Sequence, residues 1–219
     1  MRKIRDRIAQ VLSFLYPIII ETYSSSISGV IELTYEYGRL VVNTSEANYS
    51  YGSLHRVFRL VMRQMKFTDQ PAKVLILGFG AGSIAKILVE EYQLPVEIDG
   101  VEIDPVMLQI HEEYFKLETN QLKLYNQDVL TFLQNNQVQY DYIFVDVFDN
   151  LNVPEELLSK SFIKLLQEHS FTYTQIAMNT MLTEDHPFLE EWKRSFGKMA
   201  STCLFDESNL VLFVRPSTD

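Results

Sequence analysis

A short glycine-rich segment constrains the fold of this chain more than any other feature. Residues 78–83, Gly-Phe-Gly-Ala-Gly-Ser, directly follow the apolar run Lys73–Leu77 and directly precede residues with helical spacing. A buried strand that turns through glycines into a helix brings free backbone amides to the helix start, where an anionic ligand group can bind. A tight turn without any ligand would have the same pattern, so the loop alone does not decide between the two.

Strand-like and helix-like segments alternate after Pro71, which is typical of an α/β fold built from right-handed βαβ units. The expected strands are Lys73–Leu77, Val96–Glu102, Leu122–Asn126, Tyr140–Asp146, Thr172–Asn179, Ala200–Phe205 and Asn209–Val214. The expected helices are Gly82–Tyr92, Pro105–Phe115, Val129–Asn135, Pro154–His169 with a break near Ser159, and His186–Phe196.

The last two expected strands differ from the others because only Asp206, Glu207 and Ser208 separate them. Three residues allow a hairpin but not a crossover, so one of these strands must run antiparallel. We therefore predict a Rossmann-like, seven-stranded, mostly parallel sheet with helices on both faces and a terminal antiparallel hairpin.

The N-terminal region has a different pattern. An amphipathic helix is expected over about residues 3–15, with an apolar stripe formed by Ile4, Ile8, Val11, Leu12 and Leu15. From Ile18 to Thr44 the sequence predicts a small antiparallel sheet that turns near Ser28-Gly29 and Tyr37-Gly38, and a core-facing helix follows at 52–66. We predict two units: residues 1–66 hold the helix, the small β-region and the linking helix, and residues 67–219 form the Rossmann-like domain.

Composition excludes several function classes. The net charge of −10 argues against nucleic acid as a partner, and the N-terminal apolar run is too short for a membrane span. Cys203 is the only cysteine, so no internal disulfide forms and a cytoplasmic location is expected. The four histidines are scattered without metal-ligand spacing, which predicts no metal site, and we expect His111 to be a surface residue.

An acidic residue follows the glycine loop at the distance expected for a nucleoside site. Glu102 ends the next strand about 20 residues later, where a carboxylate can accept both ribose hydroxyls. Asp104, before Pro105, is expected to cap the next helix. Asp128 would cap its own helix or accept the adenine amino group, and these two alternatives stay open. The predicted cofactor-binding residues are Gly78, Phe79, Gly80, Ala81, Gly82, Glu102, Ile103, Asp128 and Val129.

A dinucleotide enzyme would also fit this fingerprint, because Gly80, Gly82 and Ala85 satisfy the relaxed G-x-G-x-x-G/A form. The terminal hairpin discriminates between dinucleotide enzymes and adenosylmethionine enzymes. A sheet that ends in such a hairpin resembles the class I adenosylmethionine-dependent transferase fold, and dinucleotide enzymes do not usually share this ending.

A family resemblance appears in YDYIFVDVFDNLNVPEELLSKSFIKLL, residues 140–166. This segment resembles the spermidine synthases, or polyamine aminopropyltransferases, in which a YD-x-I-x-x-D strand ends in a D-x-x-D pair before a Pro-containing loop. The resemblance implies that Asp146 orients the acceptor amine and takes its proton, and that Asp149 pairs with cationic charge on the substrate. Tyr49 and Tyr51 would line the amine channel, unless they only pack.

This chain also departs from that family, whose glycine loop has the form GGGDGG with an aspartate facing the cofactor amino group. Ala81 stands in that place. We therefore expect either S-adenosylmethionine or its decarboxylated form as cofactor, and transfer of an aminopropyl or methyl group to a small-molecule acceptor, with a cationic amine as one candidate. A small-molecule methyltransferase without polyamine activity and a non-catalytic nucleoside-binding module are the alternatives. A homodimer through the N-terminal region remains open.

Overall fold

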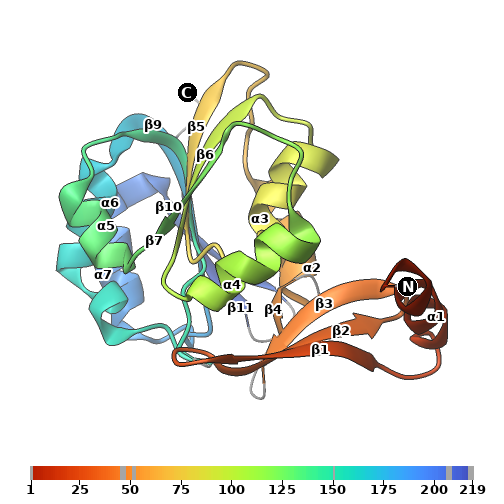
Figure 1. Ribbon diagram of the computed structural model, residues 1–219. Coiled ribbons are helices and arrows are strands. Elements are labelled where there is room, and N and C mark those ends of the chain that lie inside the picture. The colour runs from red at the N-terminus through yellow and green to blue at the C-terminus, as the bar shows by residue number, and fades with distance from the viewer. Residues whose placement is uncertain (1, 45–47, 51–52, 150, 206–208, 217–219) are drawn as a thin grey trace.

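The computed structural model describes residues 2–44, 48–50, 53–149, 151–205 and 209–216, which form two sheets (Figure 1). The larger sheet has seven strands in the order β10-β11-β9-β8-β5-β6-β7. Its strands are β5 (Ala72–Leu77), β6 (Val96–Glu102), β7 (Leu122–Asn126), β8 (Tyr140–Val145), β9 (Ser170–Thr180), β10 (Ala200–Phe205) and β11 (Asn209–Val214). Every strand expected after Pro71 is present, and the predicted fold class is confirmed.

The strand directions match the prediction from loop lengths. β5 pairs in parallel with β6 and β8, and β7 and β9 extend the parallel part. β11 runs antiparallel to both β9 and β10, in a register that joins Ala200 to Val214 and Phe205 to Asn209. The terminal hairpin is therefore inserted next to β9, which makes β10 the edge of the sheet.

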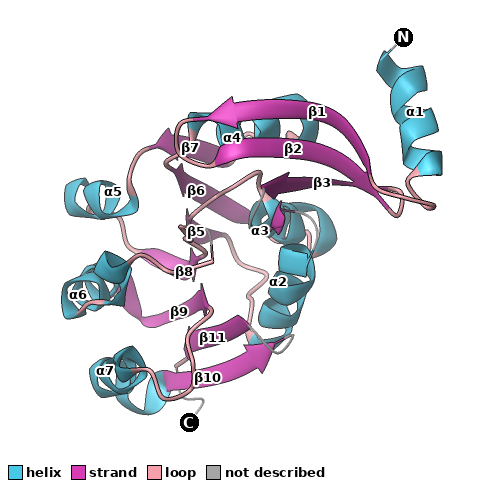
Figure 2. Cartoon of the chain, turned by 90° about the horizontal axis from the view of Figure 1, so that it is seen from below, coloured by secondary structure: helices cyan, strands magenta, loops and turns pink. Residues whose placement is uncertain are grey.

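Helices cover both faces of the large sheet (Figure 2). One face carries α5 (Val129–Asn135), α6 (Lys160–Glu168) and α7 (Pro187–Phe196), and the other carries α2 (Ser53–Gln64), α3 (Ser83–Lys86) and α4 (Pro105–Ile110). α3 continues as the π-helical turn η1 (Ile87–Glu91), and α4 continues as the π-helical turn η2 (His111–Phe115). A short 3₁₀ helix, η4 (Gly197–Met199), follows α7. The expected break near Ser159 is also present: η3 (Glu155–Leu158) ends there, and Ser159 Oγ accepts from Phe162 N at 3.2 Å to cap α6.

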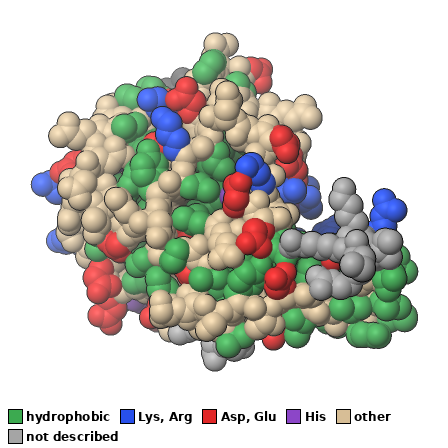
Figure 3. Space-filling model, in the orientation of Figure 1, with side chains coloured by type: hydrophobic (Ala, Val, Ile, Leu, Met, Phe, Trp, Pro, Cys, Tyr) green, Lys and Arg blue, Asp and Glu red, His purple; other side chains and the backbone are tan. Residues whose placement is uncertain are grey.

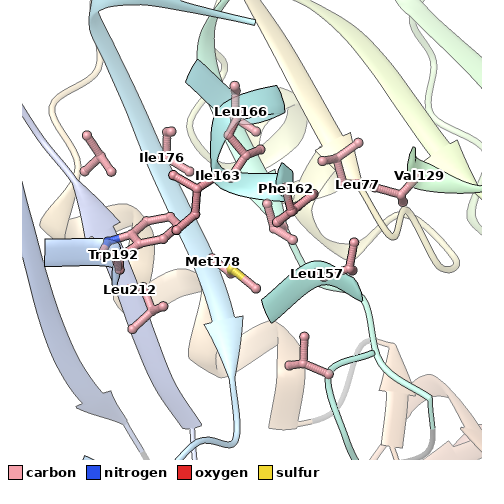
Figure 4. Packing of buried hydrophobic residues seen from close by; sticks show 14 of the residues in the cluster. Leu77, Val129, Leu157, Phe162, Ile163, Leu166, Ile176, Met178, Trp192 and Leu212 are labelled. Atoms are coloured by element: carbon pink, nitrogen blue, oxygen red, sulfur yellow. The ribbon is translucent and has the colours of Figure 1, made fainter. Parts of the chain in front are cut away.

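The core beneath α5, α6 and α7 is continuous apolar packing against the sheet (Figure 4). Trp192, Phe162 and Leu166 have no measurable exposure, and they meet Ile176, Met178 and Leu212 of the central and C-terminal strands. Burying side chains of this size contributes about 1.5–3 kcal/mol each relative to exposure. This packing fixes the carboxyl ends of β8 and β9.

The smaller sheet contains β1 (Ile18–Ser25), β2 (Gly29–Glu36), β3 (Arg39–Thr44) and β4 (Asn48–Ser50), in that order. Both predicted turns are confirmed. Its inner face packs Ile31, Leu33 and Val42 against Met107 and Ile110 of α4. Ser25 Oγ also donates to Asp104 Oδ2 at 2.6 Å in a buried contact, so the small sheet is attached to the large one by both apolar and polar groups.

The N-terminal helix α1 (Arg2–Leu12) ends before the predicted residue 15, and Ser13 then turns its side chain back to the backbone. Ser13 Oγ donates to Gln10 O at 2.7 Å and accepts from Gly38 N at 2.9 Å. The apolar stripe points outward: Val11 is 69% and Leu15 80% exposed, whereas Ala9 is buried. Hydrophobic side chains accordingly gather on the surface at this end of the molecule (Figure 3). No helix within the described ranges is both long enough and apolar enough to cross a membrane.

Candidate active site

A pocket of about 400 Å³ opens where the carboxyl ends of β5, β6 and β8 meet the tip of the β1–β2 hairpin. Its lining includes seven of the predicted site residues, namely Gly78, Glu102, Ile103, Asp128, Val129, Asp146 and Asp149. Ile27, Ser28, Thr44, Val101, Leu130, Val147, Phe148, Pro154, Glu156 and Leu157 complete it. After the roles that the sequence predicts, we call Gly78, Glu102, Ile103, Asp128 and Val129 the nucleoside side, and Asp146 and Asp149, together with the neighbouring Glu156, the acceptor side.

The glycine loop turns between β5 and α3 as its sequence predicts. Gly78 has φ +81°, and a Cβ there would lie 2.2 Å from the backbone oxygen of Asp146. Gly82 has φ +97°, and a Cβ there would lie 2.7 Å from His111 Nδ1. At these two positions both the backbone conformation and the lack of space require glycine. Because Gly78 lies so close to the backbone of Asp146, the two sides of the pocket meet at these two residues.

Glu102 connects the glycine loop to the start of α4. Its carboxylate is buried, with Oε2 accepting from Gly80 N at 2.7 Å and Oε1 accepting from Asp104 N at 2.9 Å. Burial raises the pKa of Glu102, and the backbone amide donors oppose that rise. Each carboxylate oxygen can accept a second hydrogen bond. Glu102 can therefore hold the loop and still accept from a ligand in the pocket.

The side chains of Phe79 and Ala81 belong to the core. Phe79 is 3% exposed, and its ring meets that of His111 edge-on at 4.9 Å between centroids. Ala81 is fully buried and packs with Met107 and Ile110. Residues 79–82 are not among the residues that line the pocket, so their predicted contact with a cofactor stays a prediction.

The expectation that His111 lies on the surface is wrong. His111 is 2% exposed, and its Nδ1 lies 2.9 Å from Ala81 O, beneath the glycine loop. Burial lowers the pKa of His111, which favours a neutral ring that donates to this carbonyl. The spacing of Met107, Ile110 and His111 puts all three on one helical face, and this signal could have predicted the burial.

Two aspartates serve as helix caps. Asp104 accepts from Val106 N at 2.9 Å, which confirms the expected cap of α4. Asp128 accepts from Thr131 N at 2.9 Å at the start of α5, and it also lines the pocket. Its carboxylate is exposed, so the capping role leaves an oxygen available to a ligand.

Asp146 follows β8 and is partly buried at the back of the pocket. Its backbone N–H donates to Leu77 O at 2.8 Å, and its Oδ1 accepts from Asn179 Nδ2 at 3.0 Å. Burial raises the pKa of Asp146 to about 7; the Asn179 hydrogen bond opposes this rise and the charge of Glu102 adds to it. A carboxyl group with this pKa changes its charge near neutral pH.

Asp149 is exposed at the mouth of the pocket, in a tight turn where Asp149 N donates to Asn152 O at 2.8 Å and Asn152 N donates to Asp149 O at 3.0 Å. Tyr49 belongs to β4, but its side chain lies outside the described residues, as does the whole of Tyr51. Their predicted contact with an amine stays a prediction.

Sequence reasoning missed Asn179 and Glu156. Asn179 interrupts the apolar end of β9, and a polar residue at the carboxyl end of a buried strand was the available signal. Glu156 reaches the pocket from η3, whose position depends on the loop after Asp149. Within the described residues, no three His, Cys, Asp or Glu side chains cluster as a metal site would require.

Comparison with known proteins agrees with this geometry. The structure of a probable spermidine synthase from Corynebacterium glutamicum matches with a TM-score of 0.69 at 17% identity, over 90% of this chain and 80% of that one. Human methyltransferase-like protein 13, solved with SAH, matches with a TM-score of 0.65 at 20% identity, over 76% of this chain and 83% of that one. The fold is therefore that of Rossmann-like methyltransferases.

The sequence comparisons narrow this class. The model of the Spermine/spermidine synthase domain matches residues 56–203, which is more than half of the chain, so the chain belongs to this family. A polyamine aminopropyltransferase from Streptococcus uberis is 32% identical over 142 residues, which covers 62% of this chain and 47% of that protein. The chain spans about half the length of the curated relatives that it matches.

Proposed function

We propose that this protein is a transferase that moves an aminopropyl or methyl group from an adenosyl sulfonium compound to a cationic amine. One observation supports a cationic amine as the acceptor: the pocket is lined by five carboxylates, Glu102, Asp128, Asp146, Asp149 and Glu156. No Lys, Arg or His is among its described lining residues. A small cavity with this many carboxylates and no basic side chain selects for positive charge.

The nucleoside side supports an adenosyl ligand. Glu102 can accept from ribose hydroxyls, and Asp128 can accept from an adenine amino group. Ile103, Val129 and Leu130 supply apolar surface for the base. The absence of a Cβ at Gly78 lets the backbone of Asp146 approach closely, which brings these groups and Asp146 into one pocket.

The acceptor side supports attack by an amine. The bound sulfonium supplies an alkyl carbon attached to a good leaving group. A primary amine has a pKa of about 10 and must lose a proton before it attacks this carbon. Asp146, with its pKa raised to about 7, is a stronger base than an ordinary aspartate and can take that proton. The new C–N bond then forms as the C–S bond breaks, and the proton stays on Asp146 until solvent removes it.

Distal positive charge on the acceptor would meet Asp149 and Glu156 at the mouth of the pocket. Both side chains are exposed there, so their attraction is screened and contributes mainly to orientation. We therefore expect diamines to be better acceptors than monoamines of the same length.

Methyl transfer is the second candidate, and Ala81 favours it. The spermidine synthases that this chain resembles carry an aspartate at this place, whereas Ala81 is buried with Met107 and Ile110. No carboxylate at this position repels the carboxylate of intact adenosylmethionine. Membership of the family and the acidic acceptor side favour aminopropyl transfer instead. A cofactor-binding comparison decides between the two.

The test combines calorimetry with product analysis. Titration with adenosylmethionine, decarboxylated adenosylmethionine and methylthioadenosine identifies the preferred cofactor, and incubation with a series of monoamines and diamines identifies the product by mass. We expect micromolar binding of one sulfonium compound and an alkylated diamine. Binding without turnover would favour the non-catalytic module, and binding of none of the three would refute the transferase proposal.

A further inference from the structure

The side chain that contacts Asp146 comes from the end of the neighbouring strand. The register of β8 and β9 pairs Val145 with Met178, so Asp146 and Asn179 follow at adjacent positions. Asn179 is 1% exposed, and its Nδ2 donates to Asp146 Oδ1 at 3.0 Å. β11 covers Asn179 on its other side, where it pairs with Val211. The backbone of Asn179 is therefore held between two strands, and its side-chain amide contacts Asp146.

The other half of this amide has no partner among the described residues. Asn179 Oδ1 is buried and makes no hydrogen bond to any of them. An unpaired buried polar atom is unfavourable by about 1–3 kcal/mol, so an apolar residue would serve the core better at this position. The preceding residues Ile176, Ala177 and Met178 are all apolar and buried. Stability alone does not account for an asparagine here.

We propose that Asn179 is a positioning residue for Asp146, holding its carboxyl group toward the acceptor amine before and after proton transfer, a role that rests on the proposed function. Before transfer, the Nδ2 amide donates to the Asp146 carboxylate. After the amine proton has moved to Asp146, a half-turn of the amide lets Oδ1 accept that proton in a hydrogen bond. One neutral side chain thus serves both protonation states, and it favours the ionised one because a hydrogen bond to a charged acceptor is the stronger.

Charged groups around Asp146 make this neutral partner important. Glu102 faces it from β6, while Asp128 from α5, Asp149 from the loop after β8 and Glu156 from η3 line the same pocket. All four are acidic, and the charge of Glu102 favours the protonated form of Asp146. Asn179 is the described side chain that donates to Asp146 and so favours its ionised form.

The decisive measurement is the titration of the Asp146 carboxyl carbon by nuclear magnetic resonance in the ligand-free full chain. Asn179→Leu removes the donor at similar volume, and we expect it to raise the pKa of Asp146 by about one pH unit. Thr180→Val is the matched control, since Thr180 Oγ1 donates to Leu210 O and does not contact Asp146. The control should leave this titration within 0.2 of a pH unit of the wild type, as an approximate limit set by typical additivity. Asn179→Ala is a second variant should the leucine prevent folding.

Turnover gives an independent readout. In Asn179→Leu the acidic limb of the kcat/KM profile should move upward with the titration, so that turnover at pH 6.5 falls about tenfold while cofactor affinity is unchanged. In an Asp146→Asn background the same substitution should have no further effect. An unaltered titration in both Asn179 variants would overturn the proposal. A wild type that turns over no amine would refute the proposed function instead, and the titration would still report whether Asn179 governs Asp146.

Discussion

The two sides of the pocket are held in place by different kinds of partner. On the nucleoside side, Glu102 accepts from the backbone of Gly80 and Asp104, and Asp128 accepts from the backbone of Thr131. On the acceptor side, Asp146 depends on the side chain of Asn179. Backbone donors are the same whatever the residue, whereas a side-chain donor disappears with one substitution. The positions of Glu102 and Asp128 therefore depend less on any single side-chain partner than the position of Asp146 does.

The largest expected effect is on turnover, on the acceptor side. Asp146→Asn keeps the size of the side chain but cannot accept the amine proton, so kcat should fall by about 10²–10⁴-fold while the cofactor Kd changes less than about threefold. Asp141→Asn, at the opposite end of β8, is the matched control. Parallel losses of turnover and cofactor binding in Asp146→Asn would mean that the two sides do not work separately.

The same variant should also change how the free energy of unfolding depends on pH. The folded-state pKa of Asp146, about 7, lies above its ordinary value of 3.8, so the folded state loses stability as pH rises between these values. Asp146→Asn removes this loss and should be more stable than the wild type at pH 8, by up to about 4 kcal/mol, with no difference below about pH 4. Urea unfolding at both pH values measures it.

The next effect concerns the nucleoside side. Glu102→Ala removes the carboxylate that can accept from the ribose and leaves two buried amides unpaired, so the Kd for methylthioadenosine should rise at least about 100-fold. Glu97→Ala, an exposed position at the other end of β6, provides the control. Calorimetry that finds both variants within threefold of the wild type would exclude Glu102 from the binding site.

A smaller effect should appear at Ala81. Restoring the family aspartate with Ala81→Asp puts a carboxyl group among Met107 and Ile110, and we expect the free energy of unfolding to fall by about 2–3 kcal/mol. Ala81→Ser separates the effect of size from that of charge. If Ala81→Asp is instead as stable as the wild type and prefers decarboxylated adenosylmethionine, the loop can rearrange and its apolar packing does not determine the cofactor.

The smallest effect distinguishes the two roles of Asp128. Asp128→Ala should lower stability by about 1 kcal/mol through loss of the α5 cap, whereas Asp128→Asn keeps a good cap. If Asp128 also binds adenine, both variants should weaken nucleoside binding, because the asparagine presents a neutral acceptor. Full affinity in Asp128→Asn would leave Asp128 as a cap only.

The sequence predicted the architecture well because its signals are local. Apolar runs mark each strand of the large sheet, and the three residues before Asn209 specify the hairpin. The positions of Glu102 and Asp128 were predictable for a similar reason: Glu102 ends β6, Asp128 caps α5, and both accept from backbone amides.

Features that depend on distant segments were not predictable in this way. The outward orientation of Val11 and Leu15 and the burial of His111 both depend on which surface each helix meets. Asn179 is 33 residues from Asp146 along the chain, and only the register of β8 and β9 brings them together. The predicted boundary at residue 66 stays a prediction, although α2 shares its core with β5.

The contact between Ser25 and Asp104 affects which parts of the chain can be exchanged separately. A continuous series of hydrogen bonds runs from Ser25 through Asp104 and Glu102 to Gly80, and Ile27 and Ser28 form one wall of the pocket. The segment that defines the family starts only at residue 56. A fragment cut at that point would lose this wall and uncover the apolar face of α4. The first quarter of the chain and the family domain must therefore be exchanged together.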